Sequence, residues 1–292
     1  MTTTLLDFSQ RPELALHGRV VADVEAAAGP LEISTIIAGA FARDLHLLYA
    51  YGIDTRRQTE DINLALAVPD WAAFDALKAR LLASGAFTAT ATAHRLRHRS
   101  DLPVDFVPFG RVETAHRTIE WPPSGEVVMD VFGFREALAT ALEVVLPDNA
   151  HTKVVSLPSL ALLKIVCWED RHYRSPRKDA HDLHLILRNY LQAGNEHRLW
   201  DELVDWTQED GFDYGLAGAR LLGRDLHALL DDEGLDRVSG LLSKQVNPDN
   251  PGRLPGEMNI DEPDGARVLL DAMLRGVTEN RRSKRSKRNE KP

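Results

Sequence analysis

The segment from Asp61 to Val68 constrains the fold most, because apolar residues alternate strictly along it. A period of two is typical of a strand that packs one face against a core. The apolar positions are Ile62, Leu64, Leu66 and Val68. Asp61 and Asn63 therefore share the less apolar side, at the start of the predicted strand.

A second predicted strand lies just upstream, where the apolar run from Ile33 to Ala38 ends at Gly39. A helical pattern follows. Glycine after a buried strand allows the backbone to approach a phosphate closely, and a helix start offers unpaired N–H groups. Gly39 also has a simpler interpretation as an ordinary turn residue.

Asp61 and Asn63 carry side-chain oxygens two positions apart on one strand face. Mg²⁺ prefers oxygen ligands and usually binds one or two carboxylates together with substrate phosphates. The pair is therefore a candidate metal site. The alternative is a polar turn that leads into the strand.

The residues around this segment predict alternating helices and strands. Helical spacing of apolar residues indicates helices over 14–28 and 70–85, and a further short helix is predicted over 134–144. Residues 88–110 are predicted to form a hairpin, and residues 113–131 to add strands that complete the sheet. This alternation favours a sheet flanked by helices.

Asp105 interrupts an apolar run on the second strand of that hairpin, where an unpaired buried carboxylate would be costly. It therefore needs a metal, an arginine or an edge position. Arg95, Arg97 and Arg99 alternate along the first strand. They could form ion pairs with Asp105, lie on a solvated face, or neutralise a triphosphate or an RNA backbone.

Two helices are predicted downstream, one beginning at Pro158 and one at Ser175-Pro176. Lys164 is the one charged residue in the apolar run of the first helix. Its ammonium either extends to the surface or points into a cleft as a charge for phosphates. Asp179 and Asp182 lie near the start of the second helix, where acidic residues are also favoured by the helix dipole.

The remaining chain, residues 194–277, has all-helical periodicity, and Trp200, Leu203 and Trp206 are spaced like one packed face. Residues 244–264 are rich in Pro, Gly, Asn and Asp, which predicts a long loop. Residues 281–291 hold seven Lys or Arg and one Glu. This tail is predicted to be disordered, or to act as a weak electrostatic arm for RNA.

The composition of 43% hydrophobic and 27% charged residues is that of a globular protein, and the net charge is −9. No apolar run is long enough for a membrane span, so no membrane association is predicted. The single cysteine, Cys167, cannot form an internal disulfide, which fits a reducing cytoplasm and predicts a cytoplasmic location.

Four blocks occur in one order along residues 33–187. They are Gly39-Ala40 with Ala42-Arg43-Asp44, then Arg57-x-Thr59-x-Asp61-x-Asn63, then Asp105, and last Lys164 with Arg171 and Lys178-Asp179-x-x-Asp182-Leu183. This order resembles the polymerase-β-type nucleotidyltransferase superfamily, and within it the AbiEii/AbiGii toxin family.

The resemblance implies an α+β fold with a mixed sheet flanked by helices, followed by a mostly helical C-terminal region. It places the nucleotidyltransferase core in residues 1–152, a helical region completing the cleft in 153–280, and the basic tail in 281–292. It implies transfer of a nucleoside monophosphate from a nucleoside triphosphate, with Mg²⁺ or Mn²⁺ as cofactor.

The same resemblance assigns roles to individual residues. Asp61, Asn63 and Asp105 are the expected metal ligands, and Asp61, Asp105, Lys164 and Asp179 the expected catalytic residues, with Asp179 as base or orienting group. Gly39, Ala40, Arg57, Thr59 and Lys164 are expected to contact the nucleotide. The family also implies tRNA or another RNA as acceptor and a cognate antitoxin as partner.

The chain departs from the family pattern at Asn63, where the second aspartate of the motif is expected. This change removes one negative charge from the metal site. The alternatives are therefore a weakly metal-binding enzyme, a degenerate relative that binds nucleotides, and a non-catalytic interaction module. Among enzymes, the acceptor is left open between RNA, a protein side chain and a small molecule such as an aminoglycoside.

Overall fold

The computed structural model describes residues 5–56, 59–174, 177–250 and 252–289, and it describes side chains as far as residue 279. The chain divides into two compact units. The sheet unit comprises Met1–Ala50 and Asp54–Ser156, and the helical unit comprises Tyr51–Ile53 and Leu157–Pro292. The expected boundary at 152/153 falls inside strand Ala150–Val154, and the division into compact units lies at 156/157.

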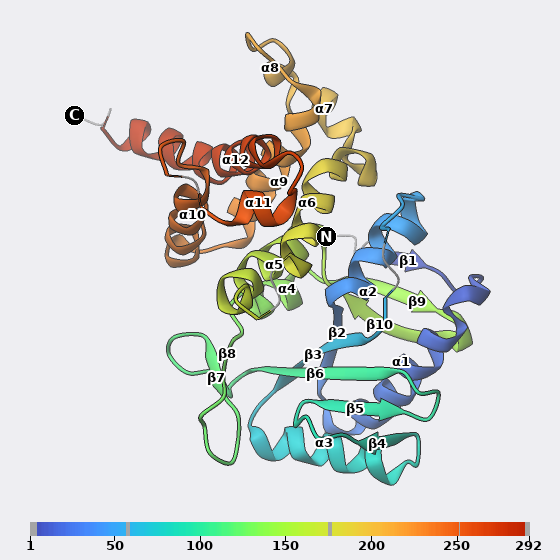
Figure 1. Ribbon diagram of the computed structural model, residues 1–292. Helices are drawn as coiled ribbons and strands as arrows, with labels where there is room; N and C mark the ends of the chain where they lie inside the picture. The colour runs from blue at the N-terminus through green and yellow to red at the C-terminus, as the bar shows by residue number, and fades with distance from the viewer. Residues whose placement is uncertain (1–4, 57–58, 175–176, 251, 290–292) are drawn as a thin grey trace. The chain divides into compact units, whose positions relative to one another are not determined.

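The sheet unit is built on an eight-stranded sheet in the order β1-β9-β10-β2-β3-β6-β5-β4 (Figure 1). Its strands are β1 Leu5–Asp7, β2 Ser34–Ala38, β3 Ile62–Val68, β4 Phe87–Ala89, β5 Arg95–His98, β6 Pro103–Gly110, β9 Leu142–Leu146 and β10 Ala150–Val154. The pairs β1/β9, β10/β2 and β3/β6 are parallel and the others antiparallel. The predicted mixed sheet is confirmed.

The central strands β2 and β3 are buried along almost their whole length. The alternating apolar residues of 61–68 form one buried face of β3. Two helices, α1 Ala15–Ala28 and α3 Trp71–Ala83, pack against each other and against the sheet. Both were predicted. The short α2, Gly39–Asp44, follows β2 and continues as a π-helical segment, Leu45–Ala50.

The region after β6 differs from the sequence prediction in two ways. Strands β7 Thr118–Glu120 and β8 Val128–Asp130 form a separate two-stranded sheet instead of completing the main one. The helix expected over 134–144 ends early, because α4 spans only Phe134–Ala139 and β9 begins at Leu142. The β-branched pair Val144 and Val145 suits a strand that is paired on both sides, by β1 and β10.

The helical unit contains the long helices that the periodicity predicted. They are α5 Leu157–Arg171, α6 Lys178–Asn189, α9 Tyr214–Leu229, α10 Asp232–Val246 and α12 Pro263–Asn289, with shorter α7 His197–Asp201, α8 Val204–Thr207 and α11 Leu254–Met258. The most extensive packing joins α9 to α12. Gly223 and Gly276 permit it, because a Cβ at either would lie 2.0 Å from a carbonyl oxygen of the facing helix.

Three expectations for this half were wrong. Trp200 is 62% exposed, so it does not share the packed face of Trp206. The loop predicted over 244–264 contains α11, whose Met258 and Leu254 are buried. The backbone of α12 continues to Asn289 through most of the expected disordered tail, and lysine and arginine are good helix formers. No helix among the described residues is both long and apolar enough to cross a membrane.

Candidate active site

The two acidic residues proposed as metal ligands lie together on neighbouring parallel strands. Asp105 of β6 is the register partner of Asn63 on β3, and Asp61 directly precedes β3. Asp61 and Asn63 are two apart and so share one side of their strand, the side on which Asp105 lies. Their expected proximity is therefore confirmed by the strand register, whereas their role as metal ligands stays a prediction.

The guanidinium of Arg95 joins the two carboxylates. Its Nε and Nη2 each donate to one oxygen of Asp105 at 2.6 Å, and Nη2 also donates to Asp61 at 3.2 Å. The hydrogen bonds from Arg95 to Asp105 raise the pKa of Arg95. The ion pair with a hairpin arginine, one of the alternatives for Asp105, is thus confirmed, and it extends to Asp61.

Gly39 lies directly beside Asn63. Its φ of +69° falls in the left-handed region that favours glycine, and a Cβ there would lie 3.0 Å from the Asn63 side chain. Ala38, the residue before it, is the register partner of Asn63. The expected closeness of the Gly39-Ala40 turn to the acidic residues is confirmed, and its contact with a triphosphate stays a prediction.

Thr59 has a different contact from the one expected. Its hydroxyl donates to Asp44, which is also bound by Arg43 at 2.6 Å and 2.9 Å. Arg43 is 1% exposed, so this ion pair is buried in the sheet unit. Thr59 therefore attaches the segment leading to Asp61 onto α2. Arg57, the other expected nucleotide contact of this motif, lies outside the described residues.

The remaining arginines of the hairpin also contact carboxylates. Arg97 binds Asp101 at 2.8 Å, and Arg99 binds Asp23 at 3.1 Å. The three arginines of the expected row thus bind four different acids, because Arg95 binds two. Only Arg95 lies at the Asp61–Asp105 pair.

The second charged group that the sequence indicated lies inside the helical unit. The Lys164 ammonium on α5 is 3.0 Å from Asp179 and 2.6 Å from Asp182, both on α6. Arg171 binds both oxygens of Asp179, at 2.9 Å and 3.1 Å. The side chains of Lys164, Asp179 and Asp182 are 5%, 2% and 2% exposed, so the expectation that Lys164 extends to the surface was wrong.

Burial and neighbouring charges shift the pKa values of this group in opposite directions, and the effect of the neighbouring charges is larger. Desolvation would lower the pKa of Lys164, but Asp182 and Asp179 raise it above its ordinary value. Desolvation would raise the pKa of Asp179, but Lys164 and Arg171 lower it. Lys164 and Asp179 therefore stay charged at neutral pH, and the cluster attaches α5 to α6. Their predicted roles in charge neutralisation and proton transfer are not tested by these contacts.

The sheet unit offers a plausible donor set for Mg²⁺ at one place. Asp61 and Asp105 already share a single cationic group, so their oxygens converge on one position. The Asn63 amide, which donates to Asp61 at 3.2 Å, would present its oxygen if turned over. Among the described residues no three His, Cys, Asp or Glu side chains are grouped to hold a metal. A Mg²⁺ ion at this place would have two carboxylates and one neutral amide oxygen as its protein ligands.

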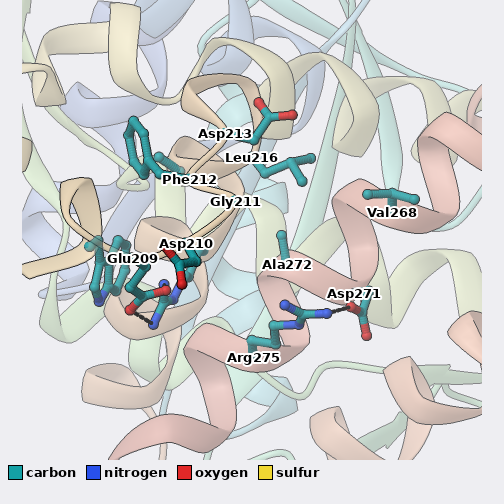
Figure 2. A pocket seen from close by; sticks show the side chains of 13 residues that line it. Glu209, Asp210, Gly211, Phe212, Asp213, Leu216, Val268, Asp271, Ala272 and Arg275 are labelled. Carbon is teal, nitrogen blue, oxygen red and sulfur yellow. Dashed lines mark hydrogen bonds and ion pairs between the residues drawn. The ribbon is translucent and has the colours of Figure 1, made fainter.

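A separate pocket of about 150 Å³ lies within the helical unit, between the segment before α9 and helix α12. Figure 2 shows Arg275 paired with Asp271 on its wall. Arg220 is bound by Glu209 and Glu279 and stacks on Trp206 at 3.9 Å. Both arginines that line the pocket are thus engaged by carboxylates, and none of the predicted site residues lines it.

The fold and the paired acids agree with the resemblance noted from the sequence. The family model of the nucleotidyl transferase AbiEii toxin, of type IV toxin–antitoxin systems, matches residues 24–282. The chain belongs to this family of nucleotidyltransferases. A comparison with curated proteins gives no match.

Solved structures give distant similarities. The antibiotic-resistance factor ANT(2'')-Ia is 13% identical, with 66% of this chain and 92% of that chain covered and a TM-score of 0.37. A nucleotidyltransferase-like protein from Paracoccidioides brasiliensis is 19% identical, with 65% and 90% covered and a TM-score of 0.37. The CD-NTase CdnG of Bradyrhizobium diazoefficiens, in complex with GTP, is 16% identical, with 94% and 87% covered and a TM-score of 0.27.

Proposed function

We propose that this protein is a Mg²⁺-dependent nucleotidyltransferase that moves a nucleoside monophosphate from a nucleoside triphosphate to a hydroxyl of RNA, with tRNA as the first candidate. The observation that carries the proposal is the convergence of Asp61 and Asp105 on one cation position, beside the Gly39 turn. Family membership supports the reaction class. The RNA acceptor and a cognate antitoxin rest on the family resemblance, and the cytoplasmic location rests on the single cysteine, Cys167.

In this reaction the acceptor oxygen forms a bond to the α-phosphorus, and the bond from that phosphorus to pyrophosphate breaks. Such transfer depends on positioning and on charge neutralisation more than on covalent help from the protein. A bound Mg²⁺ supplies charge neutralisation at the phosphates. Asp61 and Asp105 would hold it, with Asn63 as a neutral ligand, and Gly39 and Ala40 would leave space for the triphosphate.

Lys164 and Asp179 stay candidates for a triphosphate counter-charge and for the proton acceptor. In the structure their charged atoms contact each other and are buried. The reaction proposed here does not depend on them.

The test is incubation of the purified protein with each labelled nucleoside triphosphate, Mg²⁺ or Mn²⁺, and total RNA. Wild type is expected to label RNA. Asp61→Asn, which keeps the shape and removes the charge, is expected to lower labelling by more than about a hundredfold, since loss of even an outer-sphere metal partner costs ten- to a hundredfold.

Asp101→Asn is the matched control, because Asp101 lies on the hairpin that carries Asp105 but is 86% exposed and contacts only Arg97 among the ion pairs found. Its labelling should equal that of wild type. Equal labelling by wild type and Asp61→Asn would contradict the proposal. Nucleotide binding without any transfer would favour the degenerate relative that Asn63 suggests.

A further inference from the structure

The Asp61–Asp105 pair is fully engaged within the sheet unit. Arg95 binds both oxygens of Asp105 and one oxygen of Asp61, and Asn63 donates to the other oxygen of Asp61. Each of the four carboxylate oxygens thus accepts a hydrogen bond. A divalent cation bound between the two carboxylates would occupy the position that the Arg95 guanidinium now holds, so the metal ion and the guanidinium compete for that position.

We propose that Arg95 is a positioning residue that competes with the divalent cation for Asp61 and Asp105, and that this competition makes the metal and the nucleoside triphosphate bind with positive coupling. The inference rests on the proposed function and deepens it, since it concerns the order and selectivity of loading at the same site.

Burial identifies Arg95 as the partner that can move. Its side chain is 36% exposed, whereas those of Asp61 and Asp105 are 16% and 12% exposed. It is held by β5, which pairs with β6 through only three register partners. The arginine is a long side chain on the solvent side of two more buried acids. The acids are fixed and the guanidinium is the exchangeable group.

Charge explains the coupling. Two carboxylates and one guanidinium carry a net charge of −1, and this resting state is close to balanced. A divalent cation that enters alone neutralises the two carboxylates and leaves the released Arg95 guanidinium as an uncompensated positive charge beside the site. The triphosphate supplies several negative charges at the same place, so it pairs with both the metal and the released guanidinium. By linkage, each ligand then increases the affinity for the other equally.

The same competition gives selectivity against metal that arrives without its nucleotide. Asn63 supplies one negative charge fewer than aspartate would, which lowers the affinity for a free metal ion. Competition from Arg95 lowers that affinity further. Metal delivered as a complex with triphosphate overcomes both effects, because the phosphates supply ligands to the metal and a partner to Arg95.

The experiment compares wild type with Arg95→Gln, using Mn²⁺ alone and then the Mn²⁺ complex of inorganic tripolyphosphate as probes, with the free ion followed by electron paramagnetic resonance. Arg95→Gln should bind Mn²⁺ alone roughly tenfold tighter than wild type, because the competing charge is gone. The ratio of the affinity for the complex to the affinity for the metal should fall by about the same factor or more.

Two further variants keep the result interpretable. Arg97→Gln removes the next arginine of β5, which binds Asp101 instead of the acid pair, and should match wild type in both titrations. Arg95→Lys retains the charge but not the two-pronged contact, and should lie between wild type and Arg95→Gln. It also serves if Arg95→Gln fails to fold.

The inference would be overturned if Arg95→Gln and Arg95→Lys bound Mn²⁺ and its tripolyphosphate complex with wild-type affinities. The proposed function would still stand if Mn²⁺ binding were lost in Asp61→Asn. Tighter Mn²⁺ binding in Arg95→Gln without label transfer in any variant would retain the inference and reject the transferase. Absence of Mn²⁺ binding from all variants would overturn both.

Discussion

Two clusters in this protein place one cation between two carboxylates, and they differ mainly in burial. In the sheet unit Arg95 joins Asp61 and Asp105, with side chains 36%, 16% and 12% exposed. In the helical unit Lys164 joins Asp179 and Asp182, with all three at 5% exposed or less. The cation between the two acids is thus partly exposed in the sheet unit and buried in the helical unit, where Arg171 adds a second cation at Asp179.

The difference shows how a charged motif can be assigned a role. A buried cluster cannot lose one partner without leaving an uncompensated charge away from water, so it acts as a structural connection between helices. A cluster whose cation is partly exposed, as Arg95 is, can exchange that cation at a lower cost. Residues of both clusters were expected to take part in catalysis. The two clusters differ in how deeply their charged side chains are buried.

The largest expected effect on stability comes from opening the buried cluster. Lys164→Met removes the charge that compensates Asp179 and Asp182, and should cost about 3–5 kcal/mol of unfolding free energy. Arg95→Gln, its counterpart in the sheet unit, should cost less than about 1 kcal/mol. Urea denaturation followed by tryptophan fluorescence measures both. Equal losses would erase the distinction between the clusters.

A steric change in the helical unit should have a smaller effect and involve no charge. Gly223→Ala places a methyl group 2.0 Å from the carbonyl oxygen of Met273, so α9 and α12 must separate. The expected loss is about 1–3 kcal/mol by urea denaturation. Gly240→Ala on α10 is the control, because no atom lies within 4 Å of its Cβ position, and it should be neutral or slightly stabilising.

Restoring the missing acid should increase the metal affinity of the sheet-unit site. Asn63→Asp adds a third carboxylate next to Asp61 and Asp105, and is expected to tighten Mn²⁺ binding by about tenfold and to increase RNA labelling. Asn247→Asp in the helical unit makes the same change of charge at an exposed turn, and should alter neither quantity. If wild type and Asn63→Asp are both inert, the degenerate relative is favoured.

The smallest effect is expected from pH near neutrality. Asp179 has a lowered pKa, so its contribution to stability is present above its ordinary value of 3.8 and is lost as pH falls through the lower folded value. Lys164 has a raised pKa, so its contribution is present below 10.5 and is lost as pH rises through the higher folded value.

The decrease in urea midpoint caused by Lys164→Met should therefore be the same at every pH between about 5 and 9. The half-buried His17 and the buried His46 have lowered pKa values, so they should reduce the midpoints of wild type and variant alike as pH falls below 6.5. A marked change in the difference between wild type and variant from pH 6 to pH 8 would mean that the buried lysine loses its proton there. That result would contradict the assignment of the cluster as permanently charged.

Much of the sheet unit could be predicted from the sequence, because period-2 alternation and the glycine turn identify β2, α2 and β3 locally. The closeness of Asp61 and Asp105 was implied by the family resemblance and not by the local sequence pattern. Strand β9 was missed because its five residues border a true helix, and only long-range pairing with β1 and β10 determines its conformation.

The contacts of individual polar residues were harder to predict. Arg95, Arg97 and Arg99 have the same sequence pattern, yet register alone places Arg95 opposite Asp105. Thr59 belongs to the nucleotide motif but binds Asp44, an acid 15 residues earlier. Burial of Lys164 depends on the position of α6, which the local apolar run does not encode.

The fit between Gly39 and Asn63 also limits how this chain can change over evolutionary time. With 3.0 Å between a Cβ at position 39 and the Asn63 side chain, neither residue has room to become larger. Aspartate has the same outline as asparagine, and their codons differ by one base. A single point mutation is therefore enough to add or remove the third acid. Such a mutation changes the charge of the site by one unit without any repacking of the core.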